Sequence, residues 1–365
     1  MGNPDLSPAR PPIPPIRPIR PILLNRRAAT RPTITGVERW TAEIIPRLRG
    51  LDPDRYEVVA PRPRLRRRGR AQAWEQLWLP AHAARRRAEL VFSPANLAPL
   101  AWPRNVLVVH DAAVLREPEA FSAGYRAWHG SVGVACARRA LQVITVSEFS
   151  RRELIELTGL RPERLAVVPG GVGPAFRPQS QAEICRVRAK LGLDRRPYAL
   201  TLATEDQRKN LAALGQAASA LREHEIDLVR AGDARPYFTG DHHARAIRSL
   251  GYVDDADLPG LYAGARAFVL PSRYEGFGLP CLEAMAAGTP VVAADRAALP
   301  ETCGDAALLV DPDDQPAVAR ALSAAATDPV LRERLGAAGR RRAARFTWER
   351  TAQATHDLLI GLSRE

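Results

Sequence analysis

The stretch AFVLPSRYEGFGLPCLEAMAAGTPVVAAD, residues 267–295, contains a short apolar run, a glycine-rich loop, a helical segment and a second apolar run. Both apolar runs are typical of buried strands. The helix is expected to begin at Pro280, because proline suits a first helical position, and to end at Gly288, a common left-handed cap. This strand–helix–strand order predicts a parallel sheet with a crossover helix.

The glycine-rich loop has the features of an anion site. It would lie at the carboxyl edge of the sheet, in front of a helix N-terminus, where phosphate binds well. Its backbone amides would come from Gly276, Phe277, Gly278 and Leu279. Glu275 precedes them, and Glu283 is expected in the first helical turn. Since sugar hydroxyls donate hydrogen bonds to carboxylates, two acids beside an anion site fit a ligand such as a nucleotide sugar.

The same alternation of apolar runs and helical patterns fills the chain in two blocks. Strands are expected at 22–25, 56–60, 90–93, 106–109, 143–146 and 165–168, and again at 198–204, 227–231, 267–272, 291–294 and 307–310. The fold class is therefore α/β, with two doubly wound Rossmann-like domains facing a cleft. In SRREL (150–154), Ser150 is expected to cap a helix, with Glu153 completing the capping box.

The domain boundaries follow from these blocks. We expect an N-terminal domain over 22–180, a C-terminal domain over 195–345, and a C-terminal helix over 346–365 that crosses back to the N-terminal domain. The turn-rich residues 174–197 would connect the two domains. Residues 1–21 are rich in proline and arginine, which predicts a disordered tail.

Composition narrows the function classes. Of the 53 basic residues only Lys190 and Lys209 are lysines, and the formal net charge is +13. The four cysteines are widely spaced, and no apolar run is long enough for a membrane span, so we expect a cytoplasmic protein. We expect no nucleic-acid partner, because no recognisable nucleic-acid module accompanies the arginines.

Arg208 and Lys209 supply a second candidate anion contact. They occur in TLATEDQRKNL (201–211), where a strand runs into a helix start. One of the two lysines of the chain therefore lies at the carboxyl edge of the sheet. The other interpretation is a solvated basic pair.

The E-x7-E spacing of Glu275 and Glu283 resembles the signature of glycosyltransferase family 4, whose GT-B fold has two facing Rossmann-like domains. TLATEDQRKNL resembles the family's R-K-N-L element. TGVERW (35–40) resembles its glycine loop, and VLVVHDAAVL (106–115) resembles its strand-then-His-Asp element. The resemblance extends over most of residues 22–350.

This resemblance implies a retaining, metal-independent transfer of a hexose from a nucleotide diphosphate sugar. Glu275 would contact the donor hexose and Glu283 the ribose. Lys209, with Arg208 beside it, would neutralise the diphosphate. The remaining contacts carried over are Gly36 near the diphosphate, His110 near the donor sugar and the acceptor, and Tyr252 and Val253 beside the nucleobase. Ala203 and Gln207 depart from the family pattern, which has glycine and proline there.

No metal or cofactor is expected. Three D-x-D strings begin at Asp52, Asp255 and Asp311, but they fall at turns and helix starts, where aspartate caps the backbone. No histidine–carboxylate cluster has metal spacing.

The segment RPRLRRRGRAQAWEQLWLPAHAARRR (62–87) combines arginines with Trp74, Leu77 and Trp78 at helical spacing. One interpretation is peripheral contact with an anionic membrane that carries a lipid-linked acceptor. The other is a helix that packs its aromatic stripe on the sheet.

The sequence thus predicts an enzyme that glycosylates a glycan or lipid-linked acceptor in surface polysaccharide or glycoconjugate synthesis. A second hypothesis is a nucleotide-sugar-binding protein or partner subunit that has lost transfer, because a fold can persist without its chemistry.

Overall fold

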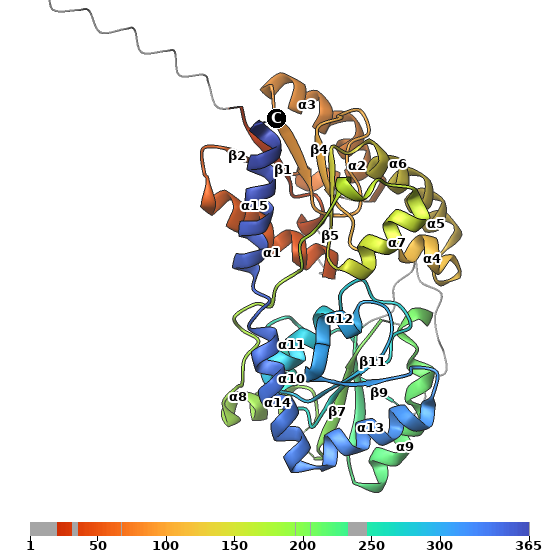
Figure 1. Ribbon diagram of the computed structural model, residues 1–365. Coiled ribbons are helices and arrows are strands. Elements are labelled where there is room, and N and C mark those ends of the chain that lie inside the picture. The colour runs from red at the N-terminus through yellow and green to blue at the C-terminus, as the bar shows by residue number, and fades with distance from the viewer. Residues whose placement is uncertain are drawn as a thin grey trace, which may run out of the picture.

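The computed structural model describes residues 20–30, 36–66, 68–193, 195–204, 206–232 and 247–364. Two α/β domains lie one above the other, and the C-terminal helix runs along the upper domain (Figure 1). The tail expected over residues 1–21 falls outside the described residues except for Arg20 and Pro21.

The N-terminal domain contains a sheet of six parallel strands in the order β2-β1-β3-β4-β5-β6. All six expected strands are confirmed, each within a residue or two of its predicted bounds. They are β1 (Ile22–Asn25), β2 (Tyr56–Val59), β3 (Leu90–Ser93), β4 (Asn105–Val108), β5 (Gln142–Thr145) and β6 (Leu165–Val167).

Helices cover both faces of this sheet, as crossovers between parallel strands require. They are α1 (Gly36–Leu51), α2 (Arg68–Ala73), the π-helical turn η3 (Trp74–Trp78), α3 (Leu79–Arg86), α4 (Ala113–Arg116), α5 (Ala123–Trp128), the π-helical turn η5 (His129–Gly133), α6 (Val134–Arg139) and α7 (Glu148–Thr158). Short 3-10 turns are η1 (Ala28–Thr30), η2 (Pro63–Leu65), η4 (Pro118–Ala120) and η6 (Pro162–Arg164).

The capping prediction for α7 was wrong by three residues. The helix begins at Glu148, and its N-cap is Ser147, whose side chain accepts a hydrogen bond from the backbone N–H of Ser150. Ser150 lies inside the helix and is fully buried. Its hydroxyl is therefore available to neighbouring carbonyls instead of to the cap.

The C-terminal domain contains a second parallel sheet in the order β12-β11-β10-β7-β8-β9. Its strands are β7 (Tyr198–Leu202), β8 (Asp227–Ala231), β9 (Arg248–Ser249), β10 (Phe268–Leu270), β11 (Val291–Ala294) and β12 (Leu308–Val310). The sequence predicted all of them except β9. That edge strand has two exposed polar residues and gives no apolar signal.

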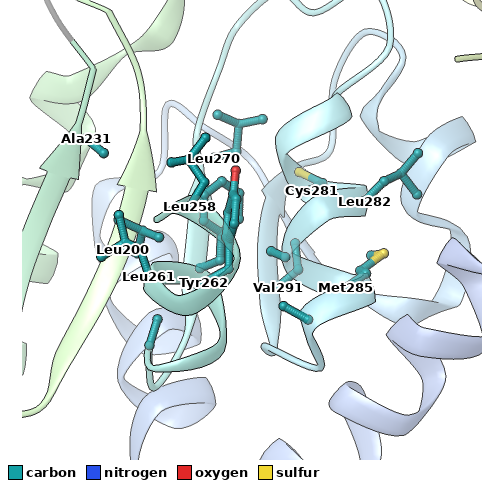
Figure 2. Close-up of a cluster of buried hydrophobic side chains, with 14 of the residues drawn as sticks. Leu200, Ala231, Leu258, Leu261, Tyr262, Leu270, Cys281, Leu282, Met285 and Val291 are labelled. Carbon is teal, nitrogen blue, oxygen red and sulfur yellow. The ribbon is translucent and has the colours of Figure 1, made fainter. Parts of the chain in front are cut away.

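Its helices are α8 (Gln181–Lys190), α9 (Gly215–Glu223), α10 (Leu258–Ala263), α11 (Leu279–Ala287), α12 (Leu299–Cys303), α13 (Gln315–Thr327), α14 (Pro329–Ala343) and α15 (Trp348–Arg364), with the 3-10 turns η7 (Gln207–Lys209), η8 (Leu211–Leu214) and η9 (Gly304–Ala306). The core fills both faces of the sheet: Leu200 packs on one face and Ala199 on the other. Figure 2 shows the first of these clusters, with Leu282 and Met285 of α11 beside the strands.

The connection between the domains is shorter than residues 174–197. Helix α8 lies within that range and buries Val187 in the core of the C-terminal domain. At the second connection, α15 leaves the C-terminal domain and packs along α1 (Figure 1). Its first residue, Trp348, lies in the N-terminal core with Trp40, at a ring-centroid distance of 6.5 Å.

Candidate active site

A cleft of about 830 Å³ lies between the two domains. The carboxyl ends of both sheets face it, because right-handed crossovers place every strand-to-helix turn on one edge of a parallel sheet. The cleft is lined by every residue proposed from the sequence: Gly36, His110, Arg208, Lys209, Tyr252, Val253, Glu275, Gly276, Phe277, Gly278, Leu279 and Glu283. The structure therefore brings both halves of the predicted site together.

Lys209 and Glu275 meet at the centre of the C-terminal half. The Lys209 Nζ lies 2.5 Å from Glu275 Oε1, and the Ser272 hydroxyl donates to the same oxygen at 2.9 Å. Lys209 ends the turn η7 after β7, while Glu275 follows β10, and these two strands are neighbours in the sheet. The sheet order thus explains why residues from separate motifs form one ion pair.

Arg208 has different partners from Lys209, although the two residues are adjacent in sequence. Its guanidinium binds Asp206 at 2.5 Å and lies over the ring of Phe121 at 4.9 Å from the centroid. Asp206 is fully buried, and Phe121 belongs to the N-terminal domain. Arg208 is therefore fixed at the domain interface by a buried carboxylate and an aromatic face.

Glu283 is buried, with 3 % of its surface exposed, and has two partners. The Tyr262 hydroxyl donates to Oε2 at 3.0 Å, and Arg39 Nη1 lies 3.2 Å from Oε1. In Figure 2 the Tyr262 hydroxyl points the way the strand arrows point. Burial raises the pKa of Glu283 to about 7, against the opposing effect of the Arg39 charge.

The glycine-rich loop has the predicted helix behind it, with two corrections. Helix α11 begins at Leu279, so Pro280 is its second residue. Glu283 is then the fifth residue of the helix. It lies beyond the first turn, whereas the sequence analysis expected it within the first turn. The helix ends at Gly288 in the left-handed conformation, as predicted, and Gly278 is the N-cap with φ of +93°.

Gly276 lies against the N-terminal domain. A Cβ on this residue would lie 2.6 Å from the carbonyl oxygen of His110 and 2.7 Å from the Cβ of Asp111. Its carbonyl oxygen accepts hydrogen bonds from the hydroxyls of Ser147 at 2.7 Å and Ser150 at 3.1 Å. Glycine is needed here because the other domain approaches the backbone closely.

The side chain of Phe277 joins the cores of both domains and lies 5.8 Å from the ring of Phe346. Leu279 packs against the N-terminal core. The side chains of these two residues therefore help to hold the domains together.

His110 follows β4 at the cleft edge and is buried. Its Nε2 lies 3.0 Å from the carbonyl oxygen of Pro94, which can only accept, so Nε2 carries a proton. Burial lowers the pKa of the imidazole, so the ring is neutral near pH 7. A neutral ring with a protonated Nε2 has its acceptor lone pair on Nδ1.

The three peripheral candidates differ in environment. Gly36 is the exposed first residue of α1, and among the described residues no atom lies within 4 Å of the position of its Cβ. Packing therefore does not require glycine there. Tyr252 is 46 % exposed, whereas Val253 is buried in the core of the C-terminal domain.

Sequence reasoning missed Arg39, Asp255 and Tyr262. Arg39 crosses the cleft from α1 and pairs with both Glu283 and Asp255, the latter at 2.6 Å. A signal existed, because Arg39 is three residues after Gly36 and therefore shares its helix face. Asp255 was interpreted as a capping residue of a D-x-D string, and no spacing connects it to Arg39.

Metal-binding geometry is not found in the described ranges, where no group of three or more His, Cys, Asp or Glu side chains could hold an ion. None of the helices in the same part of the chain is long and apolar enough to cross a bilayer.

Two facing Rossmann-like domains with acids, a lysine and helix amides at the shared cleft define the class of GT-B glycosyltransferases. Residues 35–176 match the family model described as Glycosyltransferase Family 4, and residues 196–328 match the model described as Glycosyl transferases group 1. The chain belongs to glycosyltransferase family 4.

Named relatives agree with this assignment. The chain is 36 % identical over 270 residues to the O-antigen chain mannosyltransferase B of Escherichia coli, covering 69 % of each protein. It is 32 % identical over 284 residues to the MMP alpha-(1->4)-mannosyltransferase of Mycolicibacterium hassiacum, covering 71 % of this chain and 66 % of that one. The protein is a glycosyltransferase.

Solved structures show the same fold. The sucrose-phosphate synthase of Thermosynechococcus elongatus aligns with a TM-score of 0.74 at 22 % identity, over 94 % of this chain and 99 % of that one. The Anabaena protein HepE in complex with UDP and glucose aligns with a TM-score of 0.70 at 21 % identity, over 93 % and 98 %.

Proposed function

We propose that this protein is a retaining, metal-independent hexosyltransferase that uses a nucleotide diphosphate sugar, with a mannose donor favoured. The Lys209–Glu275 pair in front of the α11 N-terminus is the observation that supports it most. One acid, one lysine and the helix amides at a single point suit a sugar joined to a pyrophosphate. Mannose is favoured because the relatives named above are mannosyltransferases.

In this proposal the donor pyrophosphate lies against the amides of residues 276–279. Lys209 and those amides face the negative charge that grows on the leaving diphosphate, while Arg208 stays anchored to Asp206. Glu275 accepts hydrogen bonds from the hexose hydroxyls, and Glu283 accepts them from the ribose. Tyr252 and Val253 border the nucleobase, and the start of α1 at Gly36 closes over the diphosphate.

The acceptor hydroxyl attacks from the face that the diphosphate leaves, as the family resemblance implies. The leaving phosphate oxygen accepts the hydroxyl proton, and the anomeric configuration is retained. The neutral His110 accepts a hydrogen bond from a substrate hydroxyl through Nδ1. No metal ion or cofactor takes part in this proposal.

A protein that binds nucleotide sugars without transferring them would keep the same donor contacts. Lys209, Glu275 and Glu283 are all present, and each has its partner. The Ala203 and Gln207 departures leave this geometry intact. The arrangement fits both hypotheses, and transfer is favoured because the relatives named above are mannosyltransferases.

A donor screen tests the proposal. Thermal unfolding is followed with UDP, GDP, ADP and dTDP sugars, since a ligand of the native state raises the midpoint. Nucleoside diphosphate release is then measured with each sugar that binds. We expect one nucleotide class to stabilise the protein and to be turned over. Stabilisation without release from any sugar, with a panel of mannoside acceptors present, would support the non-catalytic alternative.

Two further measurements test the mechanism. NMR of the product is expected to show the anomeric configuration of the donor. Activity is expected to survive dialysis against EDTA. An inverted product, or activity that returns only with added divalent cation, would contradict this part of the proposal.

We also propose that residues 62–87 bind an anionic membrane on its cytoplasmic face, where a glycan or lipid-linked acceptor is held. Trp74 is buried against the sheet, as the packing interpretation expected, but Leu77 is 73 % exposed and Trp78 is 45 % exposed. Exposed arginines flank them along the chain: Arg62, Arg64, Arg66, Arg70, Arg85, Arg86 and Arg87. An apolar tip among arginines suits the interface of an anionic bilayer.

Vesicle co-sedimentation tests this surface. The wild type is expected to pellet with vesicles that contain phosphatidylglycerol and not with neutral ones. A variant with Arg64→Glu, Arg70→Glu and Arg85→Glu is expected to stay in the supernatant. Arg222→Glu, at the end of α9, serves as the control. Equal pelleting of all three proteins would contradict the proposal.

A further inference from the structure

Arg27 lies in the N-terminal half of the cleft, outside the donor contacts described above. It follows β1 by two residues, and only 7 % of its side chain is exposed. Its Nε donates to Glu75 Oε1 at 2.8 Å, and Glu75 is itself 1 % exposed. The largely buried guanidinium of Arg27 therefore lines the cleft in which the proposed substrates would bind.

The two outer nitrogens of this guanidinium are available to a ligand. Within the described ranges no hydrogen-bond partner is found for Nη1 or Nη2 of Arg27, which donates only through Nε and its backbone N–H. These nitrogens are not fully enclosed by the protein, so an anion in the cleft can reach them and replace water as their partner. A planar fork of N–H groups matches two oxygens of one anion.

Hydrogen bonds to Glu75 and Asn25 fix the orientation of the Arg27 guanidinium. Glu75 accepts from Asn25 at 2.7 Å through the same oxygen that binds Arg27, and the backbone N–H of Arg27 donates to Asn25 Oδ1 at 3.1 Å. Asn25 ends β1, and Glu75 belongs to η3. Because Glu75 compensates the charge, recognition depends on the fork geometry more than on net charge.

The position of Arg27 sets its distance from the reacting groups. β1 and β4 are separated only by β3, so their ends lie about 10 Å apart at the usual strand spacing. His110 follows β4 by two residues, just as Arg27 follows β1. An acceptor whose hydroxyl reacts near His110 therefore reaches Arg27 with a group about two strand spacings away.

We propose that Arg27 binds a phosphate group of the acceptor. This inference rests on the proposed transferase function and adds the class of acceptor, a phosphorylated glycan or a glycan joined to lipid through phosphate. The turn η3 favours the lipid-linked source, because it carries Glu75 toward Arg27 and also carries the exposed Leu77 and Trp78.

The test compares matched acceptors in a transfer assay with the donor saturating. The probes are methyl α-mannoside, mannose 6-phosphate and mannose linked through phosphate to a short prenyl chain. The wild type is expected to show a KM about tenfold or more lower for the phosphorylated probes, as hydrogen bonds to a charged group would give. A preference for the prenyl probe alone identifies the lipid-linked source, and an equal preference identifies phosphate as such.

Two variants attribute the preference to the guanidinium. Arg27→Lys keeps a cation beside Glu75 but loses the fork, and Arg27→Met combined with Glu75→Met removes both buried partners, so neither is left uncompensated. Both are expected to lose most of the preference, while the KM for methyl α-mannoside and donor hydrolysis change less than about threefold.

Two results would overturn the assignment. One is a wild type with equal KM for the neutral and phosphorylated probes. The other is variants that weaken all three probes alike, which would show a structural role for Arg27. Failure of the transferase proposal looks different, because then no nucleoside diphosphate is released with any probe.

Discussion

Lys209 and Glu275 come from different strand-to-helix loops, yet they form one ion pair at 2.5 Å. The sequence assigned them to opposite ends of the donor, the lysine to the pyrophosphate and the acid to the hexose. In the proposed function this ion pair would therefore lie beside the bond between those two groups. One pair can thus orient the hexose and stabilise the leaving diphosphate.

Lys209→Ala is therefore expected to lower turnover by a hundredfold or more, since losing one such donor costs about 3–4 kcal/mol of barrier. Glu275→Ala is expected to have an effect of similar size. The measurement is nucleoside diphosphate release at saturating donor. Lys190→Ala is the matched control, because Lys190, the half-exposed last residue of α8, pairs with Asp257 outside the cleft and should leave turnover unchanged. Nucleoside diphosphate release at a near-wild-type rate by the Lys209 variant would show that Lys209 does not belong to the active site.

Glu283 is expected to make stability depend on pH. Its pKa is about 7 in the folded protein and ordinarily 4.5, so between these values the unfolded chain has released a proton that the native state keeps. Stability therefore falls as pH rises through this window. The Glu283→Gln variant lacks this pH dependence. Between about pH 4.5 and about pH 7, its free energy of unfolding should therefore rise relative to that of the wild type.

Urea unfolding of both proteins at several pH values measures that difference. Glu349→Gln is the control, because Glu349 is exposed and its pKa is lowered. A difference between the Glu283 variant and the wild type that stays constant with pH would contradict burial as the dominant effect on this carboxyl group.

At the scale of elements, the N-terminus of α7 is completed by the other domain. The carboxylate of Glu301, on α12, accepts hydrogen bonds from the backbone N–H groups of Glu148 at 2.9 Å and Phe149 at 3.0 Å. The side chain of Ser147, the N-cap residue, accepts a hydrogen bond from the N–H of Ser150. A side chain of one domain therefore caps a helix of the other domain. The contact exists only when the two domains are together.

Glu301→Gln is expected to weaken domain association without unfolding either domain, because losing a charged cap costs about 1 kcal/mol. Small-angle scattering should show a larger radius of gyration than the wild type, and donor KM should rise. Glu333→Gln, on α14, is the control. An unchanged radius and unchanged KM would show that this cap does not hold the domains together.

Gly276→Ala tests the tightest approach between a loop and the opposite domain. The added methyl would collide with the backbone of His110, so the loop or the whole domain must move away. We expect kcat to fall at least tenfold, because misplacement by about 1 Å can cost a hundredfold. Gly215→Ala, with open space around its Cβ, is the matched control. Unchanged kcat in the Gly276 variant would contradict the closed arrangement.

At the scale of the whole molecule, the two domains are joined by chain connections as well as by the cleft. A Cβ on Gly171 would overlap the backbone of Thr347 and Trp348, so the two connections cross in direct contact. Trp348 is 1 % exposed and opens α15, which packs on α1 (Figure 1). The end of the chain therefore helps to build the first domain.

Trp348→Ala is expected to destabilise the N-terminal domain by about 3–5 kcal/mol, the usual cost of removing a buried tryptophan. Thermal unfolding should show the loss, and far-UV circular dichroism should show native helix content below the transition. Trp128→Ala, on α5 with 36 % exposure, is the control for stability. Similar midpoints for the two variants would show that α15 does not contribute to the core.

Local pattern was enough to predict most of the fold. Apolar runs located eleven of the twelve strands, and glycine and proline located the loop and helix from Glu275 to Gly288. These features are readable because they depend on neighbours along the chain. The failures were also local: β9 has no apolar signal, and the capping-box pattern selected Ser150, whereas the helix begins three residues earlier with Ser147 as its N-cap.

The sequence by itself determined the domain architecture and the loops that carry the site, because strand periodicity and turn residues fix which segments reach the cleft edge. Only the tertiary structure decided which side chains form contacts between the two domains. Arg39 meets Glu283 across 244 positions, and Ser147 meets Gly276 across 129. Such contacts depend on how two sheets face each other to within about an ångström, and no spacing along one chain encodes that distance.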